Sequence, residues 1–488
     1  MSETLGRSTA RAAGWALLAT TGARLVSLLS LIVLARLLAP RDFGLLAVAL
    51  VFITYVETIG DLGTGSALIY WPERHREAAD VTFATSLLSG IFWFALTWVA
   101  APLVADFFNN PESTPIIRTL AWSFPIKYLG NAHDAFAQKA LHFRKRMVAE
   151  LAMAGVKAGV SVGCAVAGLG AWSLVWGQLS GLTVWTISLW FLVDWRPRLR
   201  IDTTLAGSML RYGRGIVAVN VVAALVHHAD AAVVGRFVGT AALGVYQIAY
   251  KIPEMSIAIL VWVVSKVAFP AFAKVQAARG DLAAAYRASL QYVTAMTVPA
   301  AAGLWIVAEP LVHTFFGTKW AAAIPVLRMI AIYMAIRSFG SSTGDILKAT
   351  GRTRLLALLG MARAVVLIPV LVWAARYGVV GVAAAMAAGT AVSTLVSLVV
   401  AGRILHVGPR AMLTTIRSSL IAGGAMTAAL LVLRGLLGSL SHGPALVLLV
   451  LSGALVYASV LFLIDGSTVR RVIALLGRAP ATVPGAAE

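Results

Sequence analysis

The stretch "ARLLAPRDFGLLAVA", residues 35–49, interrupts an almost continuous apolar run with Pro40, Arg41 and Asp42 and then resumes it. A related stretch, "GRFVGTAALGVYQIA", occupies residues 235–249, 200 positions later. In both stretches an arginine is followed eight positions later by glycine and then by an apolar run that reaches alanine. Proline, charge and glycine between two apolar runs are typical of a turn that joins two helices. The stretch therefore predicts a short external turn at Pro40, Arg41 and Asp42, matched by Gly239 and Thr240 in a second copy.

The composition of the chain indicates that its solvent is a lipid bilayer. Hydrophobic residues make up 60% of the 488 residues, charged residues only 12%, and the mean hydropathy is +0.86. A soluble core cannot bury so much apolar surface. A spanning helix needs about 20 apolar residues. The segments that reach this length are 14–38, 43–69, 81–107, 115–138, 147–168, 171–194, 213–238, 242–267, 286–310, 321–346, 355–375, 379–402, 413–433 and 444–465. Their continuous runs favour helices over barrel strands, so we predict an all-α polytopic inner-membrane protein with about 14 transmembrane helices.

The chain has a net charge of +20, and its basic residues are unevenly distributed among the connections between the apolar segments. With the amino terminus in the cytoplasm, basic residues gather in every second connection; they include Arg74, Arg76, Lys139, Arg144, Lys145, Arg146, Arg196, Arg198, Arg200, Lys274, Arg279, Lys348, Arg352, Arg354, Arg403 and Arg410. The other connections hold about one basic residue each. This asymmetry follows the positive-inside rule. We therefore predict cytoplasmic termini, basic loops that contact anionic membrane lipids, and no nucleic-acid partner.

Several chemistries are disfavoured by what the sequence lacks. The single cysteine, Cys164, lies inside an apolar segment, so neither an intramolecular disulfide nor a cysteine-based metal site can form. The sequence contains no phosphate-binding G-x-x-x-x-G-K-[ST] loop and no G-x-S-x-G nucleophile elbow. Met1 is followed by polar residues and the first segment has no cleavage site, so no removable signal peptide is expected. We predict no enzymatic activity, no cofactor and no metal site.

A second pair of related segments supports an internal duplication. Arg118, Lys127 and Gly130 of the fourth segment match Arg328, Arg337 and Gly340 of the tenth in spacing. Six segments separate the copies, so both enter the membrane from the same side, as in parallel repeats of transporters. This predicts a six-helix bundle at 1–195, a second at 196–402, and two additional helices with a cytoplasmic tail at 403–488.

Ionisable residues inside these segments are the candidate site residues. Each costs at least about 2.5–3.5 kcal/mol at the bilayer centre, so each is expected to face a cavity or a partner. Lys127 and Asp134 share one helical stripe with Asn131 and Gln138, and Arg337 and Asp345 share another with Ser341 and Lys348. Lys127 and Arg337 either line a cavity or form structural ion pairs with Asp134 and Asp345. Arg118 and Arg328 lie out of phase with these stripes and are expected to snorkel outward.

Other embedded charges leave two interpretations open. Arg24 lies beside threonine and serine residues that can line a wet face. Glu57 and Asp61 are one turn apart and either line the cavity or pair with Arg24. His228 and Asp230 either exchange protons near neutral pH or belong to a structural hydrogen-bond network across helices. Lys251 is a further candidate for the cavity or for coupling.

Five stretches then carry a family resemblance. They are "VLARLLAPRDFGLLAVALVF", "IGDLGTGSALI", "GRFVGTAALGVYQIAYKIPE", "FPAFAKVQ" and "FFGTKWAAAIPVLRMIA". In this order they resemble the Wzx-type polysaccharide flippases of the multidrug/oligosaccharidyl-lipid/polysaccharide superfamily, from roughly residue 10 to residue 465. The resemblance implies two pseudo-symmetric six-helix bundles around a central cavity plus two carboxy-terminal helices. It also implies an undecaprenyl-diphosphate-linked oligosaccharide as the substrate.

The implied substrate gives the embedded cations a role. A diphosphate requires cations, and guanidinium groups bind phosphate oxygens in a bidentate manner. Arg24, Lys127 and Arg337 are therefore the expected headgroup-binding set. Transport would serve capsule, O-antigen or exopolysaccharide synthesis, with a polysaccharide polymerase and chain-length or export proteins as partners. The alternatives are a cation-coupled multidrug exporter of the related MATE branch and a scaffold that transports nothing.

Overall fold

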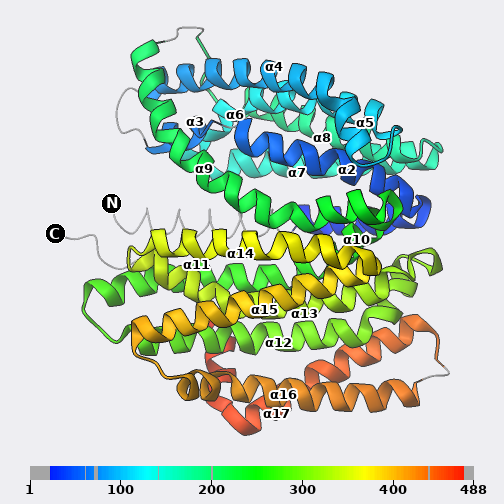
Figure 1. The fold of residues 1–488 in the computed structure, drawn as a ribbon, viewed down its shortest axis with the longest axis vertical. Helices are drawn as coiled ribbons and strands as arrows, with labels where there is room; N and C mark the ends of the chain where they lie inside the picture. Colours follow the sequence, from blue (N-terminus) through cyan, green and yellow to red (C-terminus); the bar gives the residue numbers. More distant parts are fainter. Residues whose placement is uncertain are drawn as a thin grey trace. The chain divides into compact units, whose positions relative to one another are not determined.

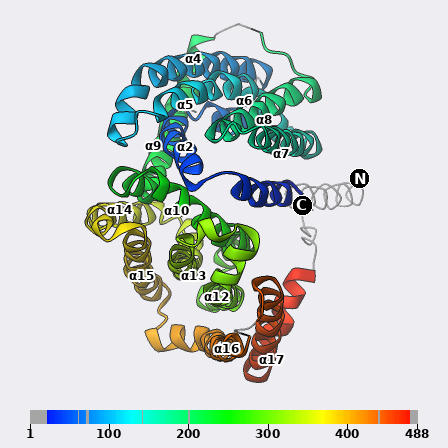
Figure 2. The same cartoon turned by 90° about the vertical axis from the view of Figure 1, so that its right-hand side faces the viewer.

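The computed structural model describes residues 22–60, 62–70, 75–140, 142–198, 202–437 and 440–477, and these form helices and connections without a β-strand. Residues 22–37 are helical. The helices that follow are α2 (Pro40–Gly60), α3 (Thr64–Tyr70), α4 (His75–Phe107), α5 (Ser113–Leu120), α6 (Ser123–Lys139), α7 (Phe143–Val166), α8 (Ala171–Leu192), α9 (Thr203–Val233), α10 (Thr240–Pro253), α11 (Ile259–Ala277), α12 (Leu282–Phe315), α13 (Ala323–Ala349), α14 (Thr353–Ala374), α15 (Gly378–Leu405), α16 (Pro409–Leu436) and α17 (His442–Gly477), as seen in Figures 1 and 2. The prediction of an all-α fold is confirmed.

Within the described residues, each of the fourteen predicted segments overlaps one helix or a run of consecutive helices. The segment 43–69 divides into α2 and α3 beside Gly63, whose φ of +67° interrupts the helix. Within the described residues, nine helical stretches are long and apolar enough to cross a membrane, and one of them, Thr353–Leu405, contains both α14 and α15. The protein is therefore a multi-pass membrane protein, while the number of fourteen crossings stays a prediction.

The predicted turn at Pro40, Arg41 and Asp42 is wrong in its bounds. Pro40 begins α2, where its fixed φ suits a helix and its missing N–H costs no hydrogen bond. The Asp42 carboxylate accepts a hydrogen bond from the backbone N–H of Ala39 at 2.8 Å, which ties the first helical turn to the residue before it. The three polar residues therefore form the first turn of α2, and the connection consists of Leu38 and Ala39.

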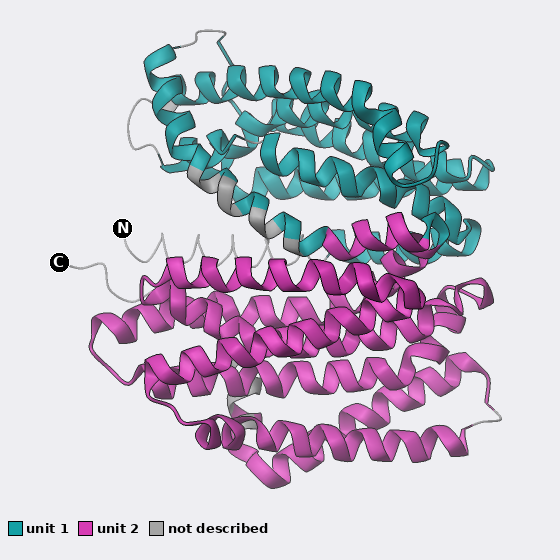
Figure 3. Cartoon of the chain, viewed as in Figure 1, with its two compact units in different colours: residues 1–228, 239–241, 478–488 teal, residues 229–238, 242–477 magenta. Residues whose placement is uncertain are grey.

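Figure 3 divides the chain into two compact units, and the described part of the first comprises residues 22–228 and 239–241. Its core has two clusters of buried side chains. One lies among α2, α4, α5, α6 and α8 around Phe124 and Tyr128, and the other joins α3, α4, α6 and α8 to the start of α9 through Met209. Burial of these apolar side chains holds α9 against the rest of the unit.

The second unit comprises residues 229–238 and 242–477. Phe272 and Tyr286 are buried where α11, α12, α13 and α15 meet. Helices α16 and α17 pack on α12, and the Tyr457 hydroxyl of α17 donates a hydrogen bond to the carbonyl of Ala295 at 2.8 Å. The predicted domains follow the sequence repeat, and their bounds differ from those of the two units. They stay predictions: bundles at 1–195 and 196–402, and two additional helices at 403–488.

Candidate functional site

A pocket of about 900 Å³ lies inside the second unit, among α11, α13, α14 and α15. Apolar side chains of α14 and α15, such as Val366 and Val392, form much of its wall. A polar stripe from α13 faces them and consists of Arg337, Ser341, Asp345 and Lys348. These residues follow one another at spacings of three or four, which places them on one helix face. The stripe predicted on the tenth segment therefore lines a pocket.

Asp345 is the buried acid of this pocket. The residue is only 7% exposed. Its Oδ1 lies 3.7 Å from Nζ of Lys348, while its Oδ2 is buried without a hydrogen-bond partner among the described residues. A buried carboxylate oxygen without a donor is costly. The oxygen can therefore accept a hydrogen bond from a hydroxyl or amide of a bound molecule.

Arg363 brings a guanidinium from α14 into the same pocket. One Nη atom donates to the Thr390 hydroxyl at 3.0 Å, while its Nε is buried without an acceptor among the described residues. The pocket thus combines three cations, Arg337, Lys348 and Arg363, with one carboxylate, so it favours an anionic ligand.

Arg363 was not among the predicted site residues, although the sequence contains a signal for it. It is the only charged residue between Arg354 and Arg376, in the middle of an apolar segment. An embedded ionisable residue indicates a functional site by default. Arg363 has no counterpart 200 residues earlier in the chain, so a pattern of duplicated cations does not indicate it.

Embedded charges of the first unit form ion pairs across helices. Nζ of Lys127 on α6 lies 2.9 Å from Oε2 of Glu57 on α2, and the guanidinium of Arg146 on α7 donates twice to Asp134, at 2.6 and 3.0 Å. The predicted pairs Lys127–Asp134 and Arg24–Glu57 are therefore wrong. Lys127 and Asp134 are seven residues apart, about 10 Å along the helix axis, so each reaches a neighbouring helix instead.

The pairing predicted for Asp345 is also wrong. Arg337 precedes it by eight residues, about 12 Å along α13, and Asp345 pairs with Lys348 instead. Asp230 is buried on α9 and accepts a hydrogen bond from the Tyr246 hydroxyl at 2.5 Å. His228 meets the ring of Tyr55 edge-on, with centroids 6.0 Å apart.

The remaining predicted site residues are Lys251, Arg24 and Asp61. Lys251 pairs with Glu254 at 2.9 Å. Arg24 is half-buried on the helix of residues 22–37, and Asp61 lies outside the described residues. Arg24 and Lys127 belong to the first unit and Arg337 to the second. Joint binding of a headgroup by these three cations therefore stays a prediction, as do coupling roles for His228 and Asp230.

Two solved structures of membrane proteins share this fold. The lipid II flippase MurJ, in an inward closed conformation, matches with a TM-score of 0.77 and 14% identity over 93% of this chain and 99% of that chain. A multidrug resistance MATE family transporter of the MOP superfamily, facing inward, gives 0.65 and 15% identity over 78% and 94%. These likenesses show that the chain shares the fold of both membrane proteins.

Similarity in sequence identifies the family of the chain. The lipopolysaccharide biosynthesis protein WzxC of Escherichia coli (strain K12) is 28% identical over 374 residues, 75% of each chain. The succinoglycan biosynthesis transport protein ExoT of Rhizobium meliloti (strain 1021) is 27% identical over 505 aligned positions, 100% of each chain. Residues 33–325, more than half of the chain, match the polysaccharide biosynthesis protein family. The chain therefore belongs to this family, and the resemblance to Wzx-type flippases is confirmed.

Proposed function

We propose that the protein moves undecaprenyl-diphosphate-linked oligosaccharide repeat units across the bacterial cytoplasmic membrane for surface polysaccharide synthesis. The observation that carries this is the pocket of the second unit, where Arg337, Lys348 and Arg363 outnumber Asp345. A multiply charged headgroup cannot enter hydrocarbon without compensating charge. The guanidinium groups suit phosphate oxygens, and the unpaired Asp345 oxygen suits a sugar hydroxyl. The chain acts as a transporter and not as an enzyme.

The lipid fraction of a deletion strain tests the proposal. Without the transporter, the repeat unit should remain on its carrier, so lipid-linked oligosaccharide should accumulate while surface polysaccharide falls. Mass spectrometry of the extracted lipids measures this and also identifies the glycan. Complementation with the intact gene is the control. An unchanged lipid fraction together with unchanged surface polysaccharide would contradict the proposal.

Export of cationic drugs remains a second candidate because of the MATE-like fold and the buried, partly unpaired Asp345. A drug-cation site needs acids and aromatic rings in excess of arginine, and the pocket has the opposite balance. Binding to the purified protein separates the candidates. A short-chain prenyl diphosphate should bind with at least tenfold higher affinity than an organic cation such as ethidium, and the reverse order would favour drug export.

The proposed topology has both termini in the cytoplasm. Pro111 lies in the connection between α4 and α5, Arg144 lies in the first turn of α7, and both are exposed. The proposed topology has these two residues on opposite sides of the membrane. In a Cys164→Ser background, Pro111→Cys should react with an impermeant thiol reagent in intact cells, and Arg144→Cys should react only after permeabilisation. Asn110 is unsuitable as a label because it is buried and donates a hydrogen bond to Thr240 at 2.7 Å. Labelling of Arg144→Cys in intact cells would invert the topology.

A further inference from the structure

Arg118 and Arg328 occupy the same local environment in their respective units. The Nε of Arg118 donates to the carbonyl of Trp98 at 3.3 Å, and that of Arg328 to the carbonyl of Trp305 at 3.2 Å. Each guanidinium also lies over the ring of its tryptophan, 4.3 and 5.4 Å from the centroid. Both units therefore contain an arginine–tryptophan pair, which a cation–π contact stabilises.

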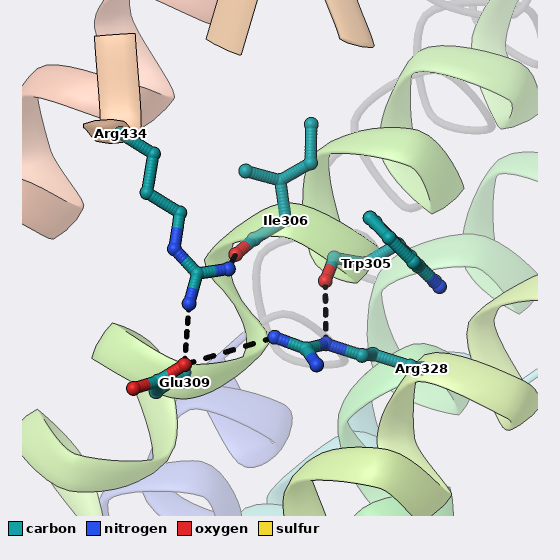
Figure 4. Close-up of polar contacts among 5 residues, drawn as sticks. All are labelled: Trp305, Ile306, Glu309, Arg328 and Arg434. Atoms are coloured by element: carbon teal, nitrogen blue, oxygen red, sulfur yellow. Dashed lines mark hydrogen bonds and ion pairs between the residues drawn. The ribbon is translucent and has the colours of Figure 1, made fainter. Parts of the chain in front are cut away.

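The second copy of this pair has a carboxylate beside its arginine. Figure 4 shows Glu309 of α12 between the guanidinium groups of Arg328 and Arg434. Its Oε2 lies 3.8 Å from Nη2 of Arg328 and accepts a hydrogen bond from Arg434 of α16. Helix α16, which follows the repeat, therefore contributes both Arg434 and apolar side chains to the surroundings of Glu309.

The first copy lacks the carboxylate. The stretch "APLVADFF" at residues 101–108 aligns with "EPLVHTFF" at residues 309–316, so Ala101 stands where the second copy has Glu309. Ala101 is completely buried. Among the described residues, Arg118 contacts Trp98, and no acidic residue lines the pocket around it. Because Arg118 has no carboxylate beside it, its guanidinium can bind an anion that comes from outside the protein.

Arg118 lies in a pocket of about 600 Å³ among the helices α4 to α8. Three tryptophans line it, Trp98, Trp122 and Trp176, and they are 45%, 53% and 47% exposed. Ser180 and Thr183 add hydroxyl groups. Guanidinium and indole N–H groups only donate hydrogen bonds, so the pocket matches an acceptor that carries negative charge. Half-exposed tryptophan rings are typical of the level at which lipid headgroups lie.

We propose that this pocket of the first unit binds the phosphate group of an anionic membrane phospholipid. Arg118 binds the phosphate oxygens, the tryptophans surround the glycerol region, and apolar lining residues such as Leu179 contact the acyl chain. The lipid supplies to Arg118 the negative charge that Glu309 supplies to Arg328. With the proposed topology the pocket lies in the outer half of the membrane. The site does not depend on the identity of the transported molecule.

Native mass spectrometry of the delipidated full-length protein tests this proposal with phosphatidylglycerol and phosphatidylcholine as probes. The wild-type protein should retain phosphatidylglycerol in preference to phosphatidylcholine. Arg118→Gln should lower its affinity for phosphatidylglycerol about tenfold or more, because a charge-assisted hydrogen bond is lost. Arg328→Gln is the matched control from the second copy and should leave the affinity unchanged. Arg376→Gln is another, since Arg376 lies over Trp373 and is exposed outside this pocket.

A second variant tests the same proposal without replacing Arg118. Ala101→Glu installs the acid of the second copy and should reduce phosphatidylglycerol binding by neutralising Arg118; size-exclusion chromatography and the thermal midpoint show whether each variant is folded. Equal binding by wild type and folded Arg118→Gln would overturn the proposal. Equal binding of phosphatidylcholine, or Arg118-dependent binding of a prenyl diphosphate without binding of phosphatidylglycerol, would overturn it as well.

Discussion

Replacing Gly44 with alanine is expected to lower surface polysaccharide more than tenfold in cells that depend on this transporter. A Cβ at Gly44 would lie 1.9 Å from the carbonyl oxygen of Thr240. That oxygen belongs to the backbone and cannot rotate away, so the start of α10 must shift. Overpacking of this kind costs about 1–3 kcal/mol, and the shift also threatens the hydrogen bond from Asn110 to the Thr240 hydroxyl.

The matched control for Gly44→Ala is Gly159→Ala on α7. A Cβ at Gly159 would meet no atom within 4 Å, and alanine has the higher helix propensity. Polysaccharide and thermal midpoint should therefore equal or exceed those of the wild type. Surface polysaccharide can be measured by antibody or dye binding, and the amount of protein in the membrane by immunoblot. Wild-type polysaccharide levels in Gly44→Ala would show that this close approach is not needed for transport.

This contact joins the two copies of the opening stretch. Gly44 belongs to the first copy of the motif and Thr240 to the second, and within the first unit the two copies touch. The sequence predicted the duplication from spacing, because a repeated pattern along the chain is visible without coordinates. It could not predict that one copy packs against the other. A glycine such as Gly44 is compatible with the close approach of another backbone, but it does not identify which residue approaches.

Helix positions were predictable because the bilayer imposes length and apolarity on each segment separately. The candidate site was less predictable because partners are chosen across helices. Lys127 pairs with Glu57, which is 70 residues away, and Asp134 pairs with Arg146 of the next helix. Such choices depend on how far each helix is rotated and how deep each charge lies, and neither quantity is encoded in spacing along one helix. The α13 stripe was predictable because its members share one face.

Arg363→Gln is the second change with a large expected effect, a loss of transport of at least tenfold with folded protein still in the membrane. Glutamine can keep the hydrogen bond to Thr390 but removes the charge. Hydrogen bonds to charged groups contribute about 1.5–3 kcal/mol, which corresponds to roughly tenfold or more in binding. Arg363→Lys should retain part of the activity, because the charge remains while bidentate contact is lost. Arg337→Gln should behave in the same way.

A structural role for these cations predicts a different outcome, and double mutants distinguish the two roles. Lys127→Ala leaves Glu57 unpaired, so adding Glu57→Ala should restore expression and transport if this ion pair of 2.9 Å serves packing. Arg363 donates to Thr390 instead of pairing with Asp345. Adding Asp345→Asn to Arg363→Gln should therefore fail to restore transport, because the phosphate-binding charge is still absent. Immunoblots score expression, and accumulation of lipid-linked oligosaccharide scores transport. Transport restored in Arg363→Gln/Asp345→Asn would show that Arg363 only balances a buried acid, and it would remove Arg363 from the headgroup site.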